Sequence, residues 1–293
     1  MTFSPGTLNE FGLLQQVAVR RPEQAFASDQ KIDAQWQDLN YHARPDLALA
    51  CQEYDAFENL LRAAGAEVVH LPAHDDVTLD ALYAHDSLIV TPNGVIRPRM
   101  GKVQRRKESA VNAAALEKTG VPVVGEITGH GKVEGGDLVW LDNGTLLAGI
   151  GYRTNTDGVR QLQKLLGPDV SVISFDMPHY KGPSDVFHLM SVLSPVDRDL
   201  AVVYQPLMPV RLVEFLDERG VRFVDVPDPE FASMGCNVLA VAPRVCIMVD
   251  GNPESVRRLE AAGATVHTYK GNEISRKGEG GPTCLTRPLV RGS

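Results

Sequence analysis

Cysteine is scarce in this 293-residue sequence, which has only four, at positions 51, 236, 246 and 284. They form neither the CxxC pairs of a zinc site nor the dense spacing of a disulfide framework. No HxxxH pair that would argue for a metal lies on a predicted helix, and no GxGxxG motif follows a predicted strand. We therefore expect reduced thiols, a cytoplasmic protein, and neither a metal nor a nucleotide cofactor.

Positive charge is also limited. The chain has 29 Lys and Arg residues and 37 Asp and Glu residues, so its net charge is -8. No long basic block is present, so a nucleic-acid partner is not expected. No segment approaches the roughly eighteen consecutive apolar residues of a membrane-spanning helix. The first residues also lack the basic and apolar regions of a signal peptide. We expect no membrane association.

Apolar residues make up 43% of the chain and occur in short Val-rich runs that alternate with helical stretches. This alternation predicts an α/β fold. The predicted helices are Pro45 to Ala64, Lys107 to Thr119, Asp157 to Leu166, Pro209 to Arg219 and Pro253 to Ala262. The predicted strands are Leu14 to Val19, Ala66 to Leu71, Ser87 to Val90, Gly94 to Ile96, Val121 to Val124, Leu138 to Leu141, Thr145 to Gly149, Val170 to Phe175, Ala201 to Tyr204, Arg222 to Val226, Asn237 to Ala242, Arg244 to Val249 and Ala264 to Thr268.

An internal repeat is visible in the phrases "LLRAAGAEVVHLP", "FLDERGVRFVDVP" and "RLEAAGATVHTY". Each phrase has a helix end, a glycine suited to a left-handed cap, and an alternating strand. Repeated units of this kind bury their apolar faces against neighbouring units. Because no linker or composition shift divides the chain, we predict a single domain over residues 1–293, built from about five such units.

Cys284 and His188 are the candidates for nucleophilic catalysis. Cys284 follows several glycines in "SRKGEGGPTCLTRPL", where the backbone can approach a ligand and a thiol is accessible. A nucleophilic cysteine needs an acid–base partner, and His188 lies at the edge of the apolar run in "SDVFHLMSVL". Buried structural roles for both side chains are the alternatives.

Four acidic residues are candidates for binding a cation. Glu134 and Asp137 flank two glycines in "VEGGD", and paired carboxylates can hold a planar guanidinium. Asp80 and Asp86 lie in "DALYAHDSL", with Asp86 directly before a predicted strand. Taken one at a time, these residues are equally consistent with turns and strand caps.

Two arginines are candidates for binding a carboxylate, because a guanidinium can bind a carboxylate through two parallel hydrogen bonds. Arg105 lies in "KVQRRKE" and Arg153 in "GYRTNTDG". An exposed, solvated position is the alternative for each of them.

Together these motifs resemble those of the guanidino-group modifying enzymes, and most closely those of the dimethylarginine dimethylaminohydrolases. The similarity extends over nearly the whole chain. Each phrase alone is weak evidence, but six phrases in the family's order and near its spacing are specific to the superfamily. In the family's order they are "DALYAHDSLIVTP", "RPRMGKVQRRKE", "VEGGDLV", "GYRTNTDG", "FHLMSVL" and "EGGPTCLT".

The resemblance implies a five-fold pseudo-symmetric α/β propeller, called the pentein fold, with repeated helix-strand units around a central site. It also implies a role for each matched residue. The catalytic residues would be Cys284, His188, Glu134 and Asp86, and the substrate-binding residues would be Asp80, Arg105, Arg153 and Asp137.

The activity implied by the resemblance is hydrolysis of a methylated arginine to citrulline and an alkylamine, through a covalent adduct on Cys284 and without a cofactor. The expected partner is a small guanidino compound, and a homodimer is the assembly to test. An arginine deiminase or dihydrolase, an amidinotransferase, and a non-catalytic guanidine-binding protein are the alternatives. The segment from Ala27 to Arg44 is expected to contain a lid over the substrate.

Overall fold

The computed structural model describes residues 3–292, in which fifteen strands form five three-stranded sheets. The inner strand of every sheet is antiparallel to one neighbour and parallel to the other. The α/β class is thereby confirmed, whereas the five-fold propeller arrangement stays a prediction. The sheets consist of β3 (Ile89–Thr91), β4 (Gly94–Arg97) and β5 (Val123–Glu126); β6 (Leu138–Asp142), β7 (Thr145–Ile150) and β8 (Ser171–Asp176); β9 (Leu193–Asp197), β10 (Leu200–Val203) and β11 (Arg222–Asp225); β12 (Leu239–Ala242), β13 (Val245–Val249) and β14 (Thr265–Tyr269); and β15 (Thr286–Arg291), β1 (Leu14–Val19) and β2 (Glu67–His70).

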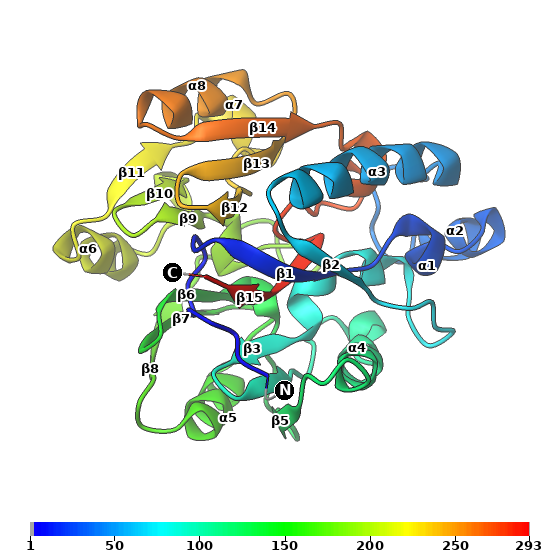
Figure 1. Cartoon of the computed structure of the whole chain (residues 1–293), viewed down its shortest axis with the longest axis horizontal. Coiled ribbons are helices and arrows are strands. Elements are labelled where there is room, and N and C mark those ends of the chain that lie inside the picture. The colour runs from blue at the N-terminus through cyan, green and yellow to red at the C-terminus, as the bar shows by residue number, and fades with distance from the viewer. Residues whose placement is uncertain (1–2, 293) are drawn as a thin grey trace.

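One longer helix connects the inner strand of each sheet to its parallel neighbour, and these helices lie at the periphery of the molecule (Figure 1). Each unit therefore has the order strand, strand, helix, strand. The connecting helices are α3 (Leu47–Ala63), α4 (Glu108–Glu117), α5 (Thr156–Leu166), α6 (Val210–Glu218) and α8 (Pro253–Ala261). The shorter elements are α1 (Pro22–Ala25), α2 (Asp29–Gln35), α7 (Asp228–Phe231), the 3-10 helices η1 (Leu79–Leu82), η2 (Ala84–Ser87), η3 (Val103–Arg105), η4 (Gly135–Asp137), η5 (Leu189–Ser191) and η6 (Gln205–Leu207), and the π-helix η7 (Asn272–Arg276).

The predicted glycine caps are present. Gly65, Gly120, Gly220 and Gly263 follow the ends of their helices with φ angles between 72° and 93°. Such angles are readily adopted only by glycine, so these residues turn the chain from helix into strand. The repeat found in the sequence is therefore a structural repeat.

Two strands, β9 and β15, were missing from the sequence prediction. Each contains a proline, Pro195 and Pro288, which counts against a strand in a sequence pattern. Both strands lie at the edge of their sheets, where a missing amide hydrogen is tolerated. The short helices α1, α2 and α7 were also not predicted, because four to seven residues are too few to show a helical period.

Helix α3 joins the first and last parts of the chain. Its buried side chains Tyr54 and Phe57 belong to a core cluster that also includes Tyr269 of β14, and the rings of Phe57 and Tyr269 lie 4.8 Å apart. On the same helix, Glu53 accepts hydrogen bonds from three successive backbone amides, those of residues 272–274. These contacts fix the start of the segment that leads to Cys284.

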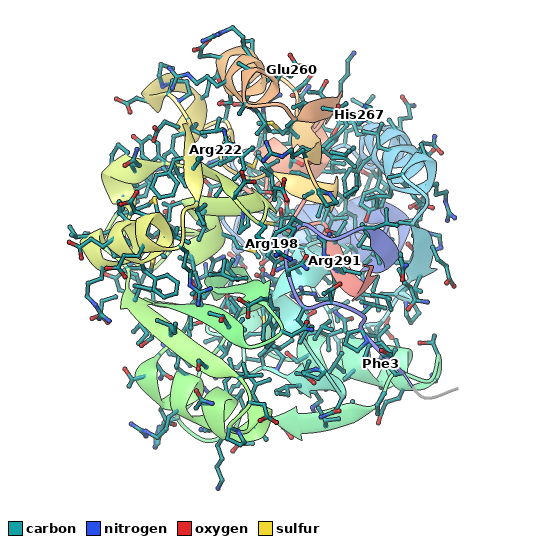
Figure 2. The ribbon with its side chains drawn as sticks, turned by 60° about the vertical axis from the view of Figure 1, so that its left-hand side comes forward. Phe3, Arg198, Arg222, Glu260, His267 and Arg291 are labelled. Atoms are coloured by element: carbon teal, nitrogen blue, oxygen red, sulfur yellow. The ribbon has the colours of Figure 1, made fainter. Side chains whose placement is uncertain are left out.

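The outer edge of the β12–β14 sheet is polar. Glu260 on α8 and His267 on β14 are exposed at the top of Figure 2, and Arg222 on β11 is exposed beside them. Arg291 on β15, near the middle of that view, is buried. Within residues 3–292, no helix combines the length and apolarity needed to cross a bilayer.

We expect Phe57→Ala to lower the free energy of unfolding by about 3–5 kcal/mol, because it opens a cavity in a fully buried cluster. Urea denaturation measures this loss. The matched control is Val210→Ala on α6, where the side chain is 72% exposed and the expected change is within about 0.5 kcal/mol. Equal effects of the two substitutions would contradict the assigned core.

Candidate active site

Five polar residues occupy the same position in the five units, in the short segment that precedes the first strand of each sheet. They are spaced 47 to 54 residues apart in the sequence. The sequence singled out four of them and missed the asparagine. They are Asp86 before β3, Glu134 before β6, His188 before β9, Asn237 before β12 and Cys284 before β15.

Asp86, Glu134 and His188 are connected by one direct contact and by contacts through Gly136. Nε2 of His188 lies 2.8 Å from Oε2 of Glu134, and both side chains are buried. Oδ1 of Asp86 accepts a hydrogen bond from the backbone amide of Gly136 at 2.9 Å. A β-carbon at Gly136 would lie 2.6 Å from Nδ1 of His188 and 2.9 Å from Oδ1 of Asp86. Because Gly136 has no β-carbon, both side chains can pack closely against its backbone. Asp86, Glu134 and His188 therefore form one buried polar cluster.

The surrounding carboxylates keep His188 protonated. Burial lowers the pKa of His188, but the charge of Asp137, the hydrogen bond to Glu134 and the charge of Asp86 outweigh burial and raise that pKa to about 9. Burial raises the pKa of Glu134, yet His188 and Arg153 more than compensate and hold it below its usual value. At neutral pH the pair is an ionised carboxylate with an imidazolium.

Asp137 lies next to His188 but does not line either of the cavities described below. Its Oδ1 accepts a hydrogen bond from the amide of Leu189, which follows His188. Burial raises the pKa of Asp137 to about 6, although the charge of His188 opposes this. The position supports an electrostatic effect on His188, and the substrate contact expected of Asp137 stays a prediction.

The Cys284 thiol is hydrogen-bonded by Asn237, whose Nδ2 lies 3.2 Å from Sγ. Oδ1 of the same amide accepts from the backbone of Thr283 at 3.0 Å, which fixes the orientation of the Asn237 side chain. Burial and then the charge of Asp86 raise the pKa of Cys284 to about 12, while the Asn237 hydrogen bond acts in the opposite direction. Without a ligand, the thiol is therefore neutral at physiological pH.

The glycines before Cys284 allow close packing within the protein, and the predicted approach of their backbone to a ligand stays a prediction. A β-carbon at Gly278 or Gly280 would overlap the side chain of Tyr83, and one at Gly281 would lie 2.5 Å from Cγ of Asn237. The glycines thus allow the segment 278–284 to pack tightly on the side chains of Tyr83 and Asn237. This packing fixes the position of Cys284.

Arg105 is buried and already bound to protein groups. Its guanidinium donates to Oδ2 of Asp86 at 2.5 Å, to both carboxylate oxygens of Glu108 at 2.8 and 3.0 Å, and to the carbonyl of Tyr83 at 2.7 Å. These bonds leave only one Nη1 hydrogen for a ligand. Arg105 compensates the charge of Asp86, and a carboxylate-binding role for it stays a prediction.

Arg153, Asp80 and Lys102 complete the polar surroundings. Nη1 of Arg153 lies 3.1 Å from Oε2 of Glu134, and Nζ of Lys102 lies 2.6 Å from Oδ2 of Asp80. The backbone amide of Lys102 also donates to Oε1 of Glu134 at 2.8 Å. Glu134 and Asp137 line neither of the cavities described next but contact His188 and Leu189, respectively, and the other predicted site residues line the smaller cavity.

Two cavities meet at Cys284 and His188, and both side chains line both cavities. The smaller cavity has a volume of about 30 Å³, and the larger about 540 Å³. The smaller one is lined by charged groups, including Asp80, Asp86 and Arg153. We name them the polar pocket and the outer chamber.

The segment predicted to contain a lid lies over the polar pocket. Leu39 and Asn40 line this pocket, and the carbonyl of Leu39 accepts from Nζ of Lys102 at 2.9 Å. Nε2 of His42 lies 2.9 Å from Oε1 of Glu279, which is in the segment before Cys284. The location agrees with the prediction, and movement of the segment stays a prediction.

Asn237 and Lys102 were absent from the sequence prediction. Asn237 was detectable in the sequence, because it falls at the spacing shared by the other four residues. Lys102 carries no such signal. Within residues 3–292, no three His, Cys, Asp or Glu side chains gather as a metal site would require.

Comparison with known proteins places the chain in a class. The fold is that of the guanidino-group modifying enzymes. The sequence model described as "N,N dimethylarginine dimethylhydrolase, eukaryotic" matches residues 21–291. The chain belongs to this family.

Among curated relatives, YkgA of Bacillus subtilis, an uncharacterised protein, is 26% identical over 97% of this chain and 94% of its own length. An arginine deiminase of Listeria monocytogenes is 29% identical over 71% of this chain, which spans only 60% of the deiminase. The chain therefore aligns with YkgA over nearly the full length of both proteins and with the deiminase over only part of it.

Solved structures show the same fold. DDAH from Pseudomonas aeruginosa, a cysteine-to-serine mutant complexed with citrulline, superposes with a TM-score of 0.74 at 21% identity, covering 94% of this chain and 99% of that one. The N-terminal domain of ArgZ, a cyanobacterial arginine dihydrolase, gives 0.78 at 20% identity with coverages of 94% and 98%. SxtG, an amidinotransferase from Microseira wollei, gives 0.77 at 17% identity with coverages of 98% and 97%.

We expect Asn237→Leu to slow alkylation of Cys284 by iodoacetamide at pH 9 by about tenfold, because a hydrogen bond that stabilises the thiolate is lost. Mass spectrometry of the Cys284 peptide over time measures the rate. Asn237→Asp keeps an acceptor for the Thr283 amide but adds negative charge, so it should slow alkylation as well. Wild-type rates in both variants would show that Asn237 does not act on the thiol.

Proposed function

We propose that the protein is a cysteine-dependent hydrolase that converts dimethylarginine to citrulline and dimethylamine. The observation that carries the proposal is the meeting of Cys284, His188 and Asp86 at one small polar pocket. Membership of the dimethylarginine hydrolase family supports the choice of a methylated arginine. In this proposal the five sheets form one catalytic unit with a propeller arrangement around the site.

Asp86 and Glu134 are proposed to hold the substrate guanidinium. The contact between Arg153 and Glu134 is consistent with this role, because the carboxylate already accepts hydrogen bonds from a guanidinium at 3.1 and 3.4 Å. Both acids are ionised, so together they favour a planar cation over a neutral ligand. Asp80 and Arg153 are proposed to contact the remaining part of the substrate.

The bound cation is proposed to activate the nucleophile. A guanidinium beside Sγ favours the thiolate, so the Cys284 proton leaves when substrate binds. The thiolate then attacks the guanidinium carbon, and protonated His188 gives its proton to the departing amine. The result is a cationic thiouronium adduct, a free amine and a neutral imidazole.

Water completes the cycle. Neutral His188 removes a proton from water, whose oxygen bonds to the adduct carbon while the carbon–sulfur bond breaks. Citrulline and the thiolate are released, and the released amine takes up the second proton of the water and becomes an ammonium ion. Atoms and charge balance without a metal or an organic cofactor. Asn237 is proposed to stabilise the thiolate in both steps.

Hydrolysis of arginine itself is the second candidate. It is favoured by the sequence similarity to an arginine deiminase and by the TM-score of 0.78 with an arginine dihydrolase domain. Arginine would use the same cysteine adduct but would release ammonia. The two reactions differ only in the group carried by the leaving nitrogen.

The decisive experiment incubates the purified protein with asymmetric dimethylarginine, monomethylarginine or arginine and quantifies citrulline, the released amine and ornithine. We expect citrulline and dimethylamine from dimethylarginine, and at least a thousandfold slower turnover by Cys284→Ser. The serine variant should retain its thermal unfolding midpoint. Citrulline and ammonia mainly from arginine would instead establish a deiminase.

The pH dependence of kcat/KM tests the charge states, since it reports the free enzyme. The active form has a thiolate and a protonated His188, whose pKa values are about 12 and about 9. Below pH 9 the imidazole is charged while the thiolate fraction grows tenfold per pH unit. We expect kcat/KM to rise up to about pH 9 and then level off. A maximum near pH 6 would contradict these charge states.

A further inference from the structure

The outer chamber is the largest space next to the catalytic pair. Its volume of about 540 Å³ lies within the usual range for ligand sites, and its wall includes both Cys284 and His188. The polar pocket beyond the same two residues measures only about 30 Å³. The guanidinium-binding acid Asp86 lines the polar pocket but not the outer chamber.

In the proposed reaction, the general acid determines where the leaving nitrogen lies. His188 must be within hydrogen-bond reach of that nitrogen, so a substituent on the nitrogen extends from His188 into whatever space is free. On the side of the polar pocket, little space is free. The outer chamber exceeds several-fold the roughly 150 Å³ that accommodates benzene in a protein interior.

Three aromatic side chains in the chamber wall, Tyr180, Phe187 and Phe231, contact one another. The rings of Tyr180 and Phe187 lie 5.6 Å apart, and those of Tyr180 and Phe231 lie 5.9 Å apart. Phe231 is in turn stacked on Tyr204 at 3.9 Å. Aromatic walls of this kind favour an apolar or aromatic ligand group.

The chamber wall also carries charges of both signs, the carboxylates of Asp185 and Glu279 and the cationic side chains of Lys181, Arg276 and Lys277. An amine that leaves the guanidinium carbon takes up a proton and becomes an ammonium ion. Carboxylates in the wall stabilise such a cation on its way out. The chamber thus combines an apolar lining for a substituent with charged groups of both signs, among them two carboxylates that can accept the ammonium ion.

From this arrangement we infer that the outer chamber is a leaving-amine site, and that the enzyme hydrolyses arginines whose ω-nitrogen carries alkyl or arylalkyl groups larger than methyl. The inference rests on the proposed function. An Nω-substituted arginine and one water give citrulline and one primary amine. Cys284 forms and breaks the bond to the guanidinium carbon, and His188 supplies the proton to the amine.

The test measures kcat/KM by citrulline formation on Nω-methyl-, Nω-propyl- and Nω-benzyl-L-arginine. We expect the propyl and benzyl compounds to be turned over within about tenfold of the methyl compound. Ala232→Trp adds a bulky ring to the chamber wall at a residue outside the catalytic cluster. It should lower kcat/KM for the benzyl compound by about tenfold or more and leave the methyl compound within about threefold.

The matched control is Val210→Trp, which places the same side chain at an exposed position of α6 and should change none of the values. Turnover of the methyl compound with a benzyl rate more than about a hundredfold lower would overturn the inference and leave the proposed function standing. Equal losses on all compounds in a folded Ala232→Trp protein would assign the chamber to the amino-acid end of the substrate. Inactivity of the wild type on methylated arginines and arginine would overturn the proposed function and the inference together.

Discussion

The buried negative charge of Asp86 and Glu134 is the constraint on which the rest of the site depends. An ionised carboxylate in the interior must be compensated, and Arg105, Arg153 and His188 provide the compensation through direct contacts. The same charge that keeps His188 protonated also disfavours a thiolate at Cys284. An additional cation beside Cys284 would relieve that conflict, and without one the thiol stays mostly protonated at neutral pH.

The five-unit architecture explains how side chains far apart in sequence reach one site. Each unit contributes the segment before its first strand, and each connecting helix lies on the outside. The strands and helices can therefore build the core while the site residues occupy short segments between them. A change of substrate requires changes only in these segments and in the cavities they line.

Much of the fold was readable from the sequence, because alternating Val-rich strands, helices and glycine caps are local patterns. The strands β9 and β15 were not predicted, since each contains a proline. A proline is tolerated in these strands because both lie at the edge of a sheet. Asp86, Glu134, His188 and Cys284 came from motif resemblance. The hydrogen bonds from Arg105 to Glu108 and the position of Asp137 beside His188 were not predicted. Both depend on the folded structure, which a sequence motif does not describe.

Strand β15 pairs with β1, joining Leu14 to Arg291, and Cys284 lies just before this last strand. On the ribosome, the acids and the histidine emerge long before the thiol does. A nascent chain therefore carries no reactive centre, and the step that brings the two ends of the chain together is also the step that delivers the nucleophile. Pairing of β15 with β1 therefore also brings Cys284 to the acids and the histidine.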